Sequence, residues 1–480
     1  MSVPDAIGLP ALTAQLAREL DLVGHNRPEW TRKRALDGAQ AHDVAIIGGG
    51  QSGLAAAFGL RGQGIADVVI LDENPAGQEG PWESYARMVT LRTPKTLNPI
   101  DFGIPSLTYR AWWEAQHGAD GWAALDKIAR GDWMAYLRWY RRALDLPVRN
   151  DARVEEIEPL PAHGLHRLQI AGQGSILARK VVLATGIQGG GEWHTPPMVR
   201  EALPSSHWAH ASARIDFAAL RGKRIAILGG GASAFDNASH ALERGAGSVD
   251  LFMRRKALPR INPIRHMEQM GFTARYPALD DARKYAVMAC FLGHNQPPTN
   301  DMFERATAHP GFTLHLGAPW TGVAMRDGQV QVETPQGTGA FDFVIVSTGL
   351  VSDPALRPEL RRLHGAIACW RDQSLPPDMD RNALIDAHPY LGPSFELTAR
   401  EPREAPRLHG LFMFNYSALI SLGLSASALS GLHHALPRLV RGIADQLFLD
   451  DKDAIVADFM AYDTPEFLGV WPRRKEEAAA

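Results

Sequence analysis

The sequence predicts an α/β protein with two parallel-sheet domains, the second inserted into the first, behind an N-terminal helical extension. Two glycine-rich turns carry this prediction, because each stands between an apolar strand and a helix, at residues 48–53 and 229–234. Two later apolar strands both end in Thr-Gly, at 185–186 and 348–349, which indicates that the chain returns to the first domain after the second. Such strand–turn–helix–strand units are typical of Rossmann-like dinucleotide-binding domains.

The predicted boundaries follow from these patterns. The helical extension takes residues 1–40, the first part of the first domain 41–195, the inserted domain 196–340, and the second part of the first domain with the C-terminal helices 341–480. Two consecutive prolines, Pro196 and Pro197, mark the crossing into the inserted domain. Aliphatic residues recur on one helix face of the extension: Leu12, Leu16, Leu20 and Val23.

The first glycine turn has the spacing that a bound pyrophosphate requires. Gly48 permits the tight turn, Gly50 lets the backbone approach the phosphates, and Gly53 lets the helix pack close to the strand. The N-terminus of that helix supplies free N–H groups and partial positive charge. Asp72 ends the next strand, where a carboxylate can accept hydrogen bonds from a ribose, so this unit is expected to hold FAD. Its expected contacts are Gly48, Gly50, Gln51, Ser52, Gly53, Asp72 and Glu73.

Later segments of the first domain are expected to surround the same cofactor. The loop after Asp72 carries Trp82 and Arg92, which are candidates for contact with a flavin or its phosphates, with ordinary loop packing as the alternative. Thr185 and Gly186 end a buried strand at a glycine that can approach a ligand closely.

The second glycine turn is followed by basic residues in place of an acid. Its second strand ends in Arg-Arg-Lys at residues 254–256, where the first unit has Asp72. A cationic cluster at the ribose end matches a 2′-phosphate, so this unit is expected to hold NADPH in preference to NADH. The expected contacts are Gly229, Gly231, Ala232, Ser233, Ala234, Arg254 and Arg255. Gly349, at the second Thr-Gly ending, is a further cofactor-binding candidate.

Two apolar stretches of the sequence are each compatible with more than one structure. Residues 109–146 are rich in aromatic residues at helical spacing, which favours core or a subunit interface over the wall of a substrate channel. Residues 408–437 carry no Asp, Glu, Lys or Arg but hold too many polar groups for a membrane span, so a buried stretch is predicted. Within it, Asn415 precedes a helix whose N-terminus is expected to face the flavin ring.

Composition narrows the class of protein. The 480 residues have a net charge of −3, which argues against nucleic acid as the main partner. The two cysteines form no CxxC pair, and the N-terminus lacks a secretion signal, so a cytoplasmic setting is expected. No cluster with metal-ligand spacing is recognised beyond His207 and His210, and no metal is expected.

With these motifs in view, the chain resembles the flavin-containing monooxygenase superfamily over roughly residues 43–440. The resemblance implies that NADPH reduces FAD, that O₂ then gives a C4a-(hydro)peroxyflavin, and that a small organic substrate is oxygenated at nitrogen or sulfur or by a Baeyer–Villiger reaction. His210 matches the histidine of a superfamily motif, whose other positions differ here, and it joins Arg92 and Asn415 as the catalytic candidates.

Two alternatives and one partner remain open from the sequence. An NADPH-dependent flavoprotein reductase that passes electrons to a quinone or another acceptor would need the same two turns. A disulfide reductase would need a CxxC pair, which this chain lacks. A homodimer is a candidate assembly, and the substrate cannot be named.

Overall fold

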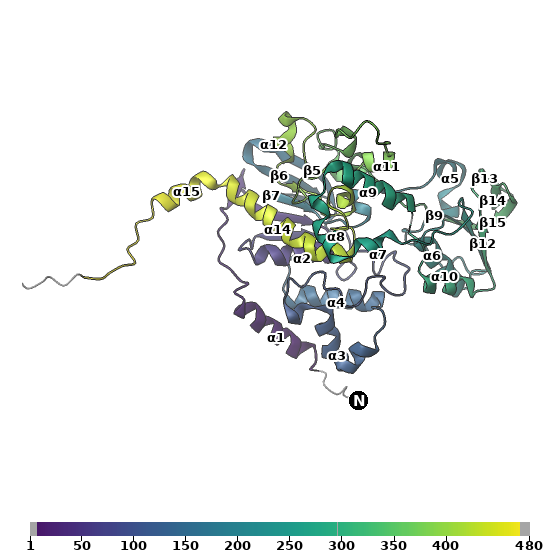
Figure 1. Ribbon diagram of the computed structural model, residues 1–480, viewed down its shortest axis with the longest axis horizontal. Coiled ribbons are helices and arrows are strands. Elements are labelled where there is room, and N and C mark those ends of the chain that lie inside the picture. The colour runs from purple at the N-terminus through teal and green to yellow at the C-terminus, as the bar shows by residue number, and fades with distance from the viewer. Residues whose placement is uncertain (1–6, 295, 471–480) are drawn as a thin grey trace, which may run out of the picture.

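The computed structural model describes residues 7–294 and 296–470 (Figure 1). Its larger sheet is built on β2, Ala39–Ile47, whose second half is an apolar run with almost no exposure. The strand order is β4-β3-β2-β7-β6-β5, with β1 antiparallel to β2 and β18 parallel to β7. The bounds are β1 Arg34–Leu36, β3 Val68–Leu71, β4 Val148–Arg149, β5 Val154–Leu160, β6 Leu165–Ile170, β7 Gly174–Leu183 and β18 Leu411–Phe412.

The centre of this sheet is parallel and its far edge is antiparallel. β2 pairs in parallel with both β3 and β7, which brings the glycine turn after β2 and the Thr-Gly ending after β7 to the same edge. In doubly wound sheets, ligands bind outside the carboxyl ends of the strands. The first nucleotide turn and Thr185 therefore meet at the edge where a cofactor is expected.

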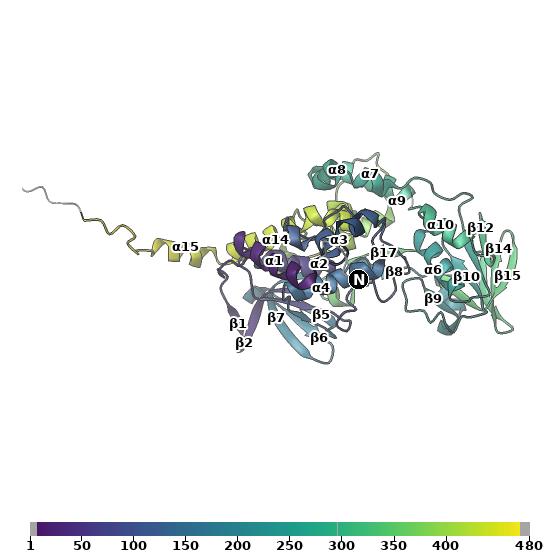
Figure 2. The ribbon, with the colours of Figure 1, turned by 90° about the horizontal axis from the view of Figure 1, so that it is seen from below.

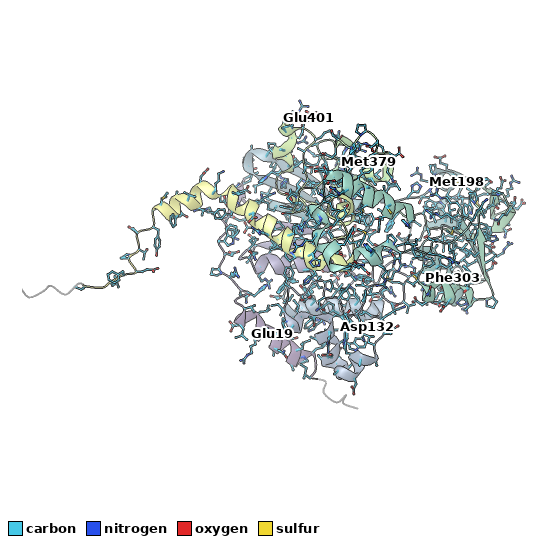
Figure 3. The ribbon with its side chains drawn as sticks, viewed as in Figure 1. Glu19, Asp132, Met198, Phe303, Met379 and Glu401 are labelled. Atoms are coloured by element: carbon cyan, nitrogen blue, oxygen red, sulfur yellow. The ribbon has the colours of Figure 1, made fainter. Side chains whose placement is uncertain are left out.

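Helices of the first unit gather on one face of the larger sheet (Figure 2). α2 packs against α14, and the N-terminal α1 packs on α3. Glu19 of α1, labelled in Figure 3, accepts hydrogen bonds from Ser106 N at 3.0 Å and Ser106 Oγ at 2.7 Å. The bounds are α1 Leu9–Leu22, α2 Gln51–Arg61, α3 Tyr109–Ala124, α4 Arg130–Ala143, α14 Leu429–Asp450 and α15 Lys452–Met460.

The aromatic segment forms part of the core of the first unit. Trp133, Tyr136 and Tyr140 of α4 are at most 1% exposed and lie in the same apolar cluster as β2 and α2. The prediction of a core stripe at helical spacing is confirmed. The uncharged stretch is also largely buried, and among residues 7–294 and 296–470 no helix has the length and apolar character needed to cross a membrane.

The second unit is a five-stranded parallel sheet in the order β12-β11-β10-β16-β9. A three-stranded antiparallel sheet, β13-β14-β15, is inserted in the chain between β12 and β16. α10 packs on α6 through Phe303, labelled in Figure 3, whose ring centroid lies 5.8 Å from that of Phe235. The bounds are α5 Pro197–Ala202, β9 Trp208–His210, β10 Arg224–Leu228, α6 Ala232–Glu243, β11 Ser248–Met253, α10 Asn300–Thr307, β12 Phe312–Leu316, β13 Gly322–Arg326, β14 Gln329–Thr334, β15 Gly337–Phe341 and β16 Phe343–Val346.

The two crossings between the units lie side by side. β8, Gly191–Trp193, pairs antiparallel with β17, Leu350–Ser352, and forms a separate two-stranded ribbon. Since β16 belongs to the second sheet, that sheet extends past residue 340, where the sequence analysis ended the inserted domain. We therefore propose that the return crossing lies after Val346, because the apolar run of β16 pairs with β10 and not with the first sheet.

One group of helices leaves the second unit between β11 and β12 and packs against the first. α9 contacts α13 and α11, and α8 contacts α14. Their shared apolar cluster includes Tyr276, Tyr285, Met288 and Trp370. The bounds are α7 Pro263–Met267, α8 Met270–Arg275, α9 Asp281–His294, α11 Ala383–Asp386, α12 Ala405–Leu408 and α13 Leu419–Leu422.

Candidate functional site

In the first glycine turn, two positions have no room for a side chain and a third has open space beside it. Gly48 has φ +108°, and a Cβ there would lie 2.5 Å from the Ala184 carbonyl oxygen. A Cβ on Gly53 would lie 1.9 Å from the Gly48 carbonyl oxygen. At Gly50, the nearest atom is Gly80 Cα at 3.9 Å, so the start of α2 is open on that side. The turn therefore fits a pyrophosphate, because only Gly50 faces free space at the helix N-terminus.

Asp72 is buried and braces this turn. Its Oδ2 accepts a hydrogen bond from Gly49 N at 2.7 Å, and its Oδ1 accepts from Asn74 N at 2.8 Å and Asn74 Nδ2 at 3.0 Å. A carboxylate has about four lone-pair sites, and these three hydrogen bonds leave one of them, on Oδ2. The geometry leaves capacity for the ribose contact that the sequence predicts. Glu73, by contrast, is exposed and lies 3.9 Å from Arg153.

A cavity of about 460 Å³ adjoins the first turn. Gly49, Gly50 and Leu54 form one wall, and α4 forms another with the arginines at positions 138, 141 and 142. Arg141 is paired with the buried Glu79 at 2.6 Å. These arginines were not among the residues predicted from the sequence, because the prediction for α4 rested on its aromatic face. Their spacing of three and four residues places them together on the opposite face of the helix.

Trp82 lies inside the loop after Asp72 and is 9% exposed. Its ring meets that of Trp133 edge-on with centroids 6.5 Å apart, and Trp133 Nε1 donates to Gln51 Oε1 at 3.1 Å. Gln51 is the first residue of α2. Trp82 therefore packs against Trp133, which in turn hydrogen-bonds to the first residue of the helix at the glycine turn. The next residue, Ser52, is buried.

Asn415 ties two segments of the first unit together at the end of β7. It is 0% exposed, and its Nδ2 donates to Thr185 Oγ1 and to the Gly189 carbonyl, both at 3.1 Å. Its Oδ1 accepts from Ser417 N at 2.9 Å and caps a short helical turn. Gly186, next to Thr185, has φ +71° and its carbonyl accepts from the Tyr416 N–H at 3.2 Å. Because the Asn415 side chain is enclosed and fully engaged, it positions the loop at residues 185–189.

The second glycine turn repeats the geometry of the first. Gly229 has φ +128°, and a Cβ there would lie 2.1 Å from the Ser347 carbonyl oxygen, whereas nothing lies within 4 Å of a Cβ on Gly231. Ala232 and Ala234 are buried in α6, and Ser233 is exposed. Gly349, with φ +80°, is exposed on the return strand. A dinucleotide phosphate fits at Gly231 for the same reason as at Gly50.

The basic residues after β11 differ in what they contact. Arg255 donates to the carbonyl oxygens of Gly293 at 3.0 Å and His294 at 3.4 Å, which places it on the C-terminal end of α9. Arg254 is exposed and makes no hydrogen bond or ion pair within the part of the chain that the structure describes. Arg254 is therefore the better placed of the two for a 2′-phosphate.

His210 lies next to the ribbon that joins the two units. Its ring stacks on Trp193 of β8 with centroids 5.2 Å apart, and Trp193 also meets Tyr85 edge-on at 6.0 Å. The Nδ1 accepts a hydrogen bond from Ser212 N at 3.1 Å. Burial lowers the pKa of His210 to about 4, so the ring is neutral near pH 7. Its contacts are those of a packed, uncharged ring at the crossing.

Arg92 lies where the first unit meets the second. The Arg92 carbonyl accepts from Arg265 of α7 at 3.5 Å, and Arg87, in the same loop, donates to the Ala213 carbonyl at 3.0 Å. Burial lowers the pKa of Arg92, while the nearby carboxylates of Asp236 and Asp301 oppose that shift. Burial also raises the pKa of Asp236 to about 6. No group of three or more His, Cys, Asp or Glu able to hold a metal occurs in the described ranges.

Comparison with known proteins identifies the family. The profile of the pyridine nucleotide-disulphide oxidoreductase family matches residues 45–267. The FAD-dependent urate hydroxylase of Xanthomonas campestris pv. campestris is 57% identical over 473 residues, which are 98% of this chain and 100% of that protein. The chain belongs to the flavin-containing monooxygenase superfamily. It is a flavoprotein oxidoreductase of the monooxygenase class, as the resemblance implied.

Solved structures share its fold. An ornithine hydroxylase from Pseudomonas aeruginosa superimposes with a TM-score of 0.66 at 17% identity and covers 85% of this chain and 100% of its own. An L-lysine 6-monooxygenase from Pseudomonas syringae gives 0.65 at 18% identity, with 84% and 99% covered. These structural superpositions establish the two-unit fold. The predicted fold class is confirmed.

Proposed function

We propose that this chain is an FAD-dependent urate hydroxylase that takes its electrons from NADPH. The observation that carries the proposal is 57% identity to an enzyme of that activity along nearly the whole of both chains. Both glycine turns support it, since each has one glycine, Gly50 or Gly231, whose Cβ position is open. The reaction balances as urate, O₂, NADPH and a proton giving hydroxylated urate, NADP⁺ and water.

In this proposal the first turn holds FAD, which accepts hydride from NADPH and activates O₂ when bound. Gly50 and the N-terminus of α2 approach the pyrophosphate, and Asp72 accepts from the ribose. Arginines of α4 add positive charge beside the turn. The residues proposed to position this cofactor are Gly48, Gln51, Ser52, Gly53, Glu73, Trp82, Thr185 and Gly186.

The second turn is proposed to hold NADPH. Gly231 and Ser233 lie at the N-terminus of α6, and Arg254 stands free at the end of β11. A guanidinium favours a 2′-phosphate, which a carboxylate would repel. Gly229, Ala232, Ala234 and Gly349 shape the backbone around this site, while Arg255 ties the segment after β11 to the C-terminal end of α9.

The test of the proposal is oxygenation of urate by purified, FAD-loaded protein. With NADPH present, we expect urate to disappear in proportion to NADPH and O₂ consumed, with little hydrogen peroxide. L-ornithine and L-lysine serve as comparison substrates, since hydroxylases of those amino acids share the fold. NADPH consumption that yields hydrogen peroxide, or reduces a quinone, while urate stays intact would instead support the reductase alternative.

We also propose a setting and an assembly. The cysteines Cys290 and Cys369 are both free, which suits the reducing cytoplasm where NADPH is abundant. The net charge of −3 fits the absence of nucleic acid as a partner. The assembly we propose is a homodimer acting on a small molecule and O₂. Light scattering of the loaded enzyme measures the assembly directly, and a monomer mass would remove the dimer from the proposal.

A further inference from the structure

The partly buried Arg92 differs from two other arginines of the first unit in what its guanidinium contacts. Arg179 is 0% exposed and lies 2.6 Å from Asp451 and 3.4 Å from Asp43. Arg141 is paired with Glu79. For Arg92, in contrast, no side-chain hydrogen bond or ion pair occurs anywhere in the described part of the chain, while its Nε, like that of Arg179, is enclosed without a partner.

A cation that is partly buried without a partner is costly, and at Arg92 the Nε is the enclosed atom. Arginine stays protonated in proteins, so it cannot escape the cost of burial by losing its proton. Asp236 and Asp301 face it, but neither lies within ion-pair distance. Charged groups taken out of water are normally paired or hydrogen-bonded. The terminal N–H groups of Arg92 are thus suited to receive an anion from outside the chain.

The position of Arg92 restricts which anion that can be. Its loop is held by the second unit at two points, through the Arg92 carbonyl with Arg265 and through Arg87 with Ala213. The phosphates of the two cofactors have cradles of their own at Gly50 and Gly231, and a 2′-phosphate has Arg254. Asp236, which faces Arg92 from α6, would repel a phosphate with two negative charges more strongly than an anion with a single charge.

We propose that Arg92 binds the urate anion and sets the orientation in which its ring is presented for hydroxylation. Urate is a planar monoanion at neutral pH with neighbouring oxygen and nitrogen acceptors on its edges. A guanidinium presents N–H donors in a fixed fork that matches such an edge with two parallel hydrogen bonds. This inference rests on the proposed urate hydroxylase function and adds to it the residue that recognises the substrate.

The experiment compares Arg92→Ala and Arg92→Lys with Arg254→Ala in FAD-loaded enzyme. Loss of a charge-assisted bidentate pair predicts that Arg92→Ala raises KM for urate about 30-fold or more, with KM for NADPH unchanged. Arg92→Lys keeps the charge without the fork and is expected to fall between wild type and Arg92→Ala. Arg254→Ala is expected to show the reverse pattern, a raised KM for NADPH alone.

A second measurement distinguishes charge recognition from shape. Tetramethylurate has the same ring system but no ionisable N–H, so Arg92→Ala should lose affinity for urate far more than for tetramethylurate. Binding is followed by the change in the flavin absorption spectrum without NADPH. A urate KM unchanged in both Arg92 variants, or a raised KM for NADPH in Arg92→Ala, would overturn the assignment.

The same titrations separate the two proposals. Wild-type enzyme that binds urate through Arg92 but leaves it unoxidised would refute the hydroxylase function and keep the binding site. If wild-type enzyme hydroxylates urate and Arg92→Ala has an unchanged KM for urate, the hydroxylase function stands and the Arg92 site is refuted. Wild-type enzyme that neither binds nor oxidises urate would refute both.

Discussion

Replacement of Asn415 by alanine tests whether this side chain holds the end of β7 in place. The variant loses the donors to Thr185 Oγ1 and the Gly189 carbonyl and the acceptor for Ser417 N, all inside a region with 0% exposure at Asn415. Loss of an N-cap costs about 1 kcal/mol. A buried carbonyl left unpaired adds about 1–3 kcal/mol, so the expected destabilisation is about 3 kcal/mol.

The matched control is Asn382→Ala. Asn382 also caps a helix, with its Oδ1 accepting from Leu384 N at 3.0 Å, but within residues 7–294 and 296–470 its side chain makes no further hydrogen bond. Its loss is expected to cost about 1 kcal/mol, as for an ordinary cap. The difference between the two variants isolates the contribution of the bonds to Thr185 and Gly189.

The assay is urea unfolding of the FAD-loaded protein, followed by the flavin fluorescence that appears on release. With an m-value of about 3 kcal/mol/M, Asn415→Ala lowers the midpoint by about 1 M and Asn382→Ala by about a third of that. We also expect Asn415→Ala to retain less FAD after gel filtration, since Ala184, which adjoins Thr185, touches the glycine turn at Gly48. Equal midpoints for the two variants would refute the role of Asn415 as a clamp.

Two further predictions follow from the turns and from a buried histidine. Gly50→Ala should fold and lose FAD affinity, whereas Gly53→Ala should fail to fold because its Cβ would lie 1.9 Å from the Gly48 carbonyl oxygen; folded, FAD-replete protein in both cases would contradict this. His388 is buried, and burial lowers its pKa to about 4. As the pH falls from about 6.5 towards 4, this histidine is protonated in the unfolded chain but not in the folded one, so the stability of the folded protein decreases. That loss is about 3 kcal/mol at most, and His388→Leu should flatten the pH dependence of the urea midpoint over this range, with an unchanged slope as the contrary result.

Local patterns in the sequence were sufficient for the nucleotide-binding framework. Each glycine turn needs specific residues to satisfy backbone geometry, so Gly48, Gly53 and Gly229 reveal their roles through spacing alone. Asp72 is placed by the end of β3 in the same way. Long apolar strands and the helical stripe of α4 are likewise set by periodicity, which is a property of neighbouring residues.

Contacts between distant segments could not be anticipated in that way. The apolar run 343–346 looks equally suited to either sheet, and only pairing with β10 places it in the second. In the sequence, Arg254 and Arg255 are equivalent candidates for the 2′-phosphate. They differ only because the C-terminal end of α9 lies against Arg255 and accepts its hydrogen bonds. The isolation of Arg92 depends on residues of both units and of α7, which no local pattern in the loop could show.

The ribbon of β8 and β17 has a consequence for how the molecule can be rearranged. Gly191 and Ser352 lie opposite each other, so everything between them is topologically the loop of a single hairpin. The nucleotide module thus enters and leaves the first unit at one place, while its helices α8 and α9 pack on that unit at a second place. Any change in the relative position of the two units would therefore have to break this second contact as well as bend the ribbon.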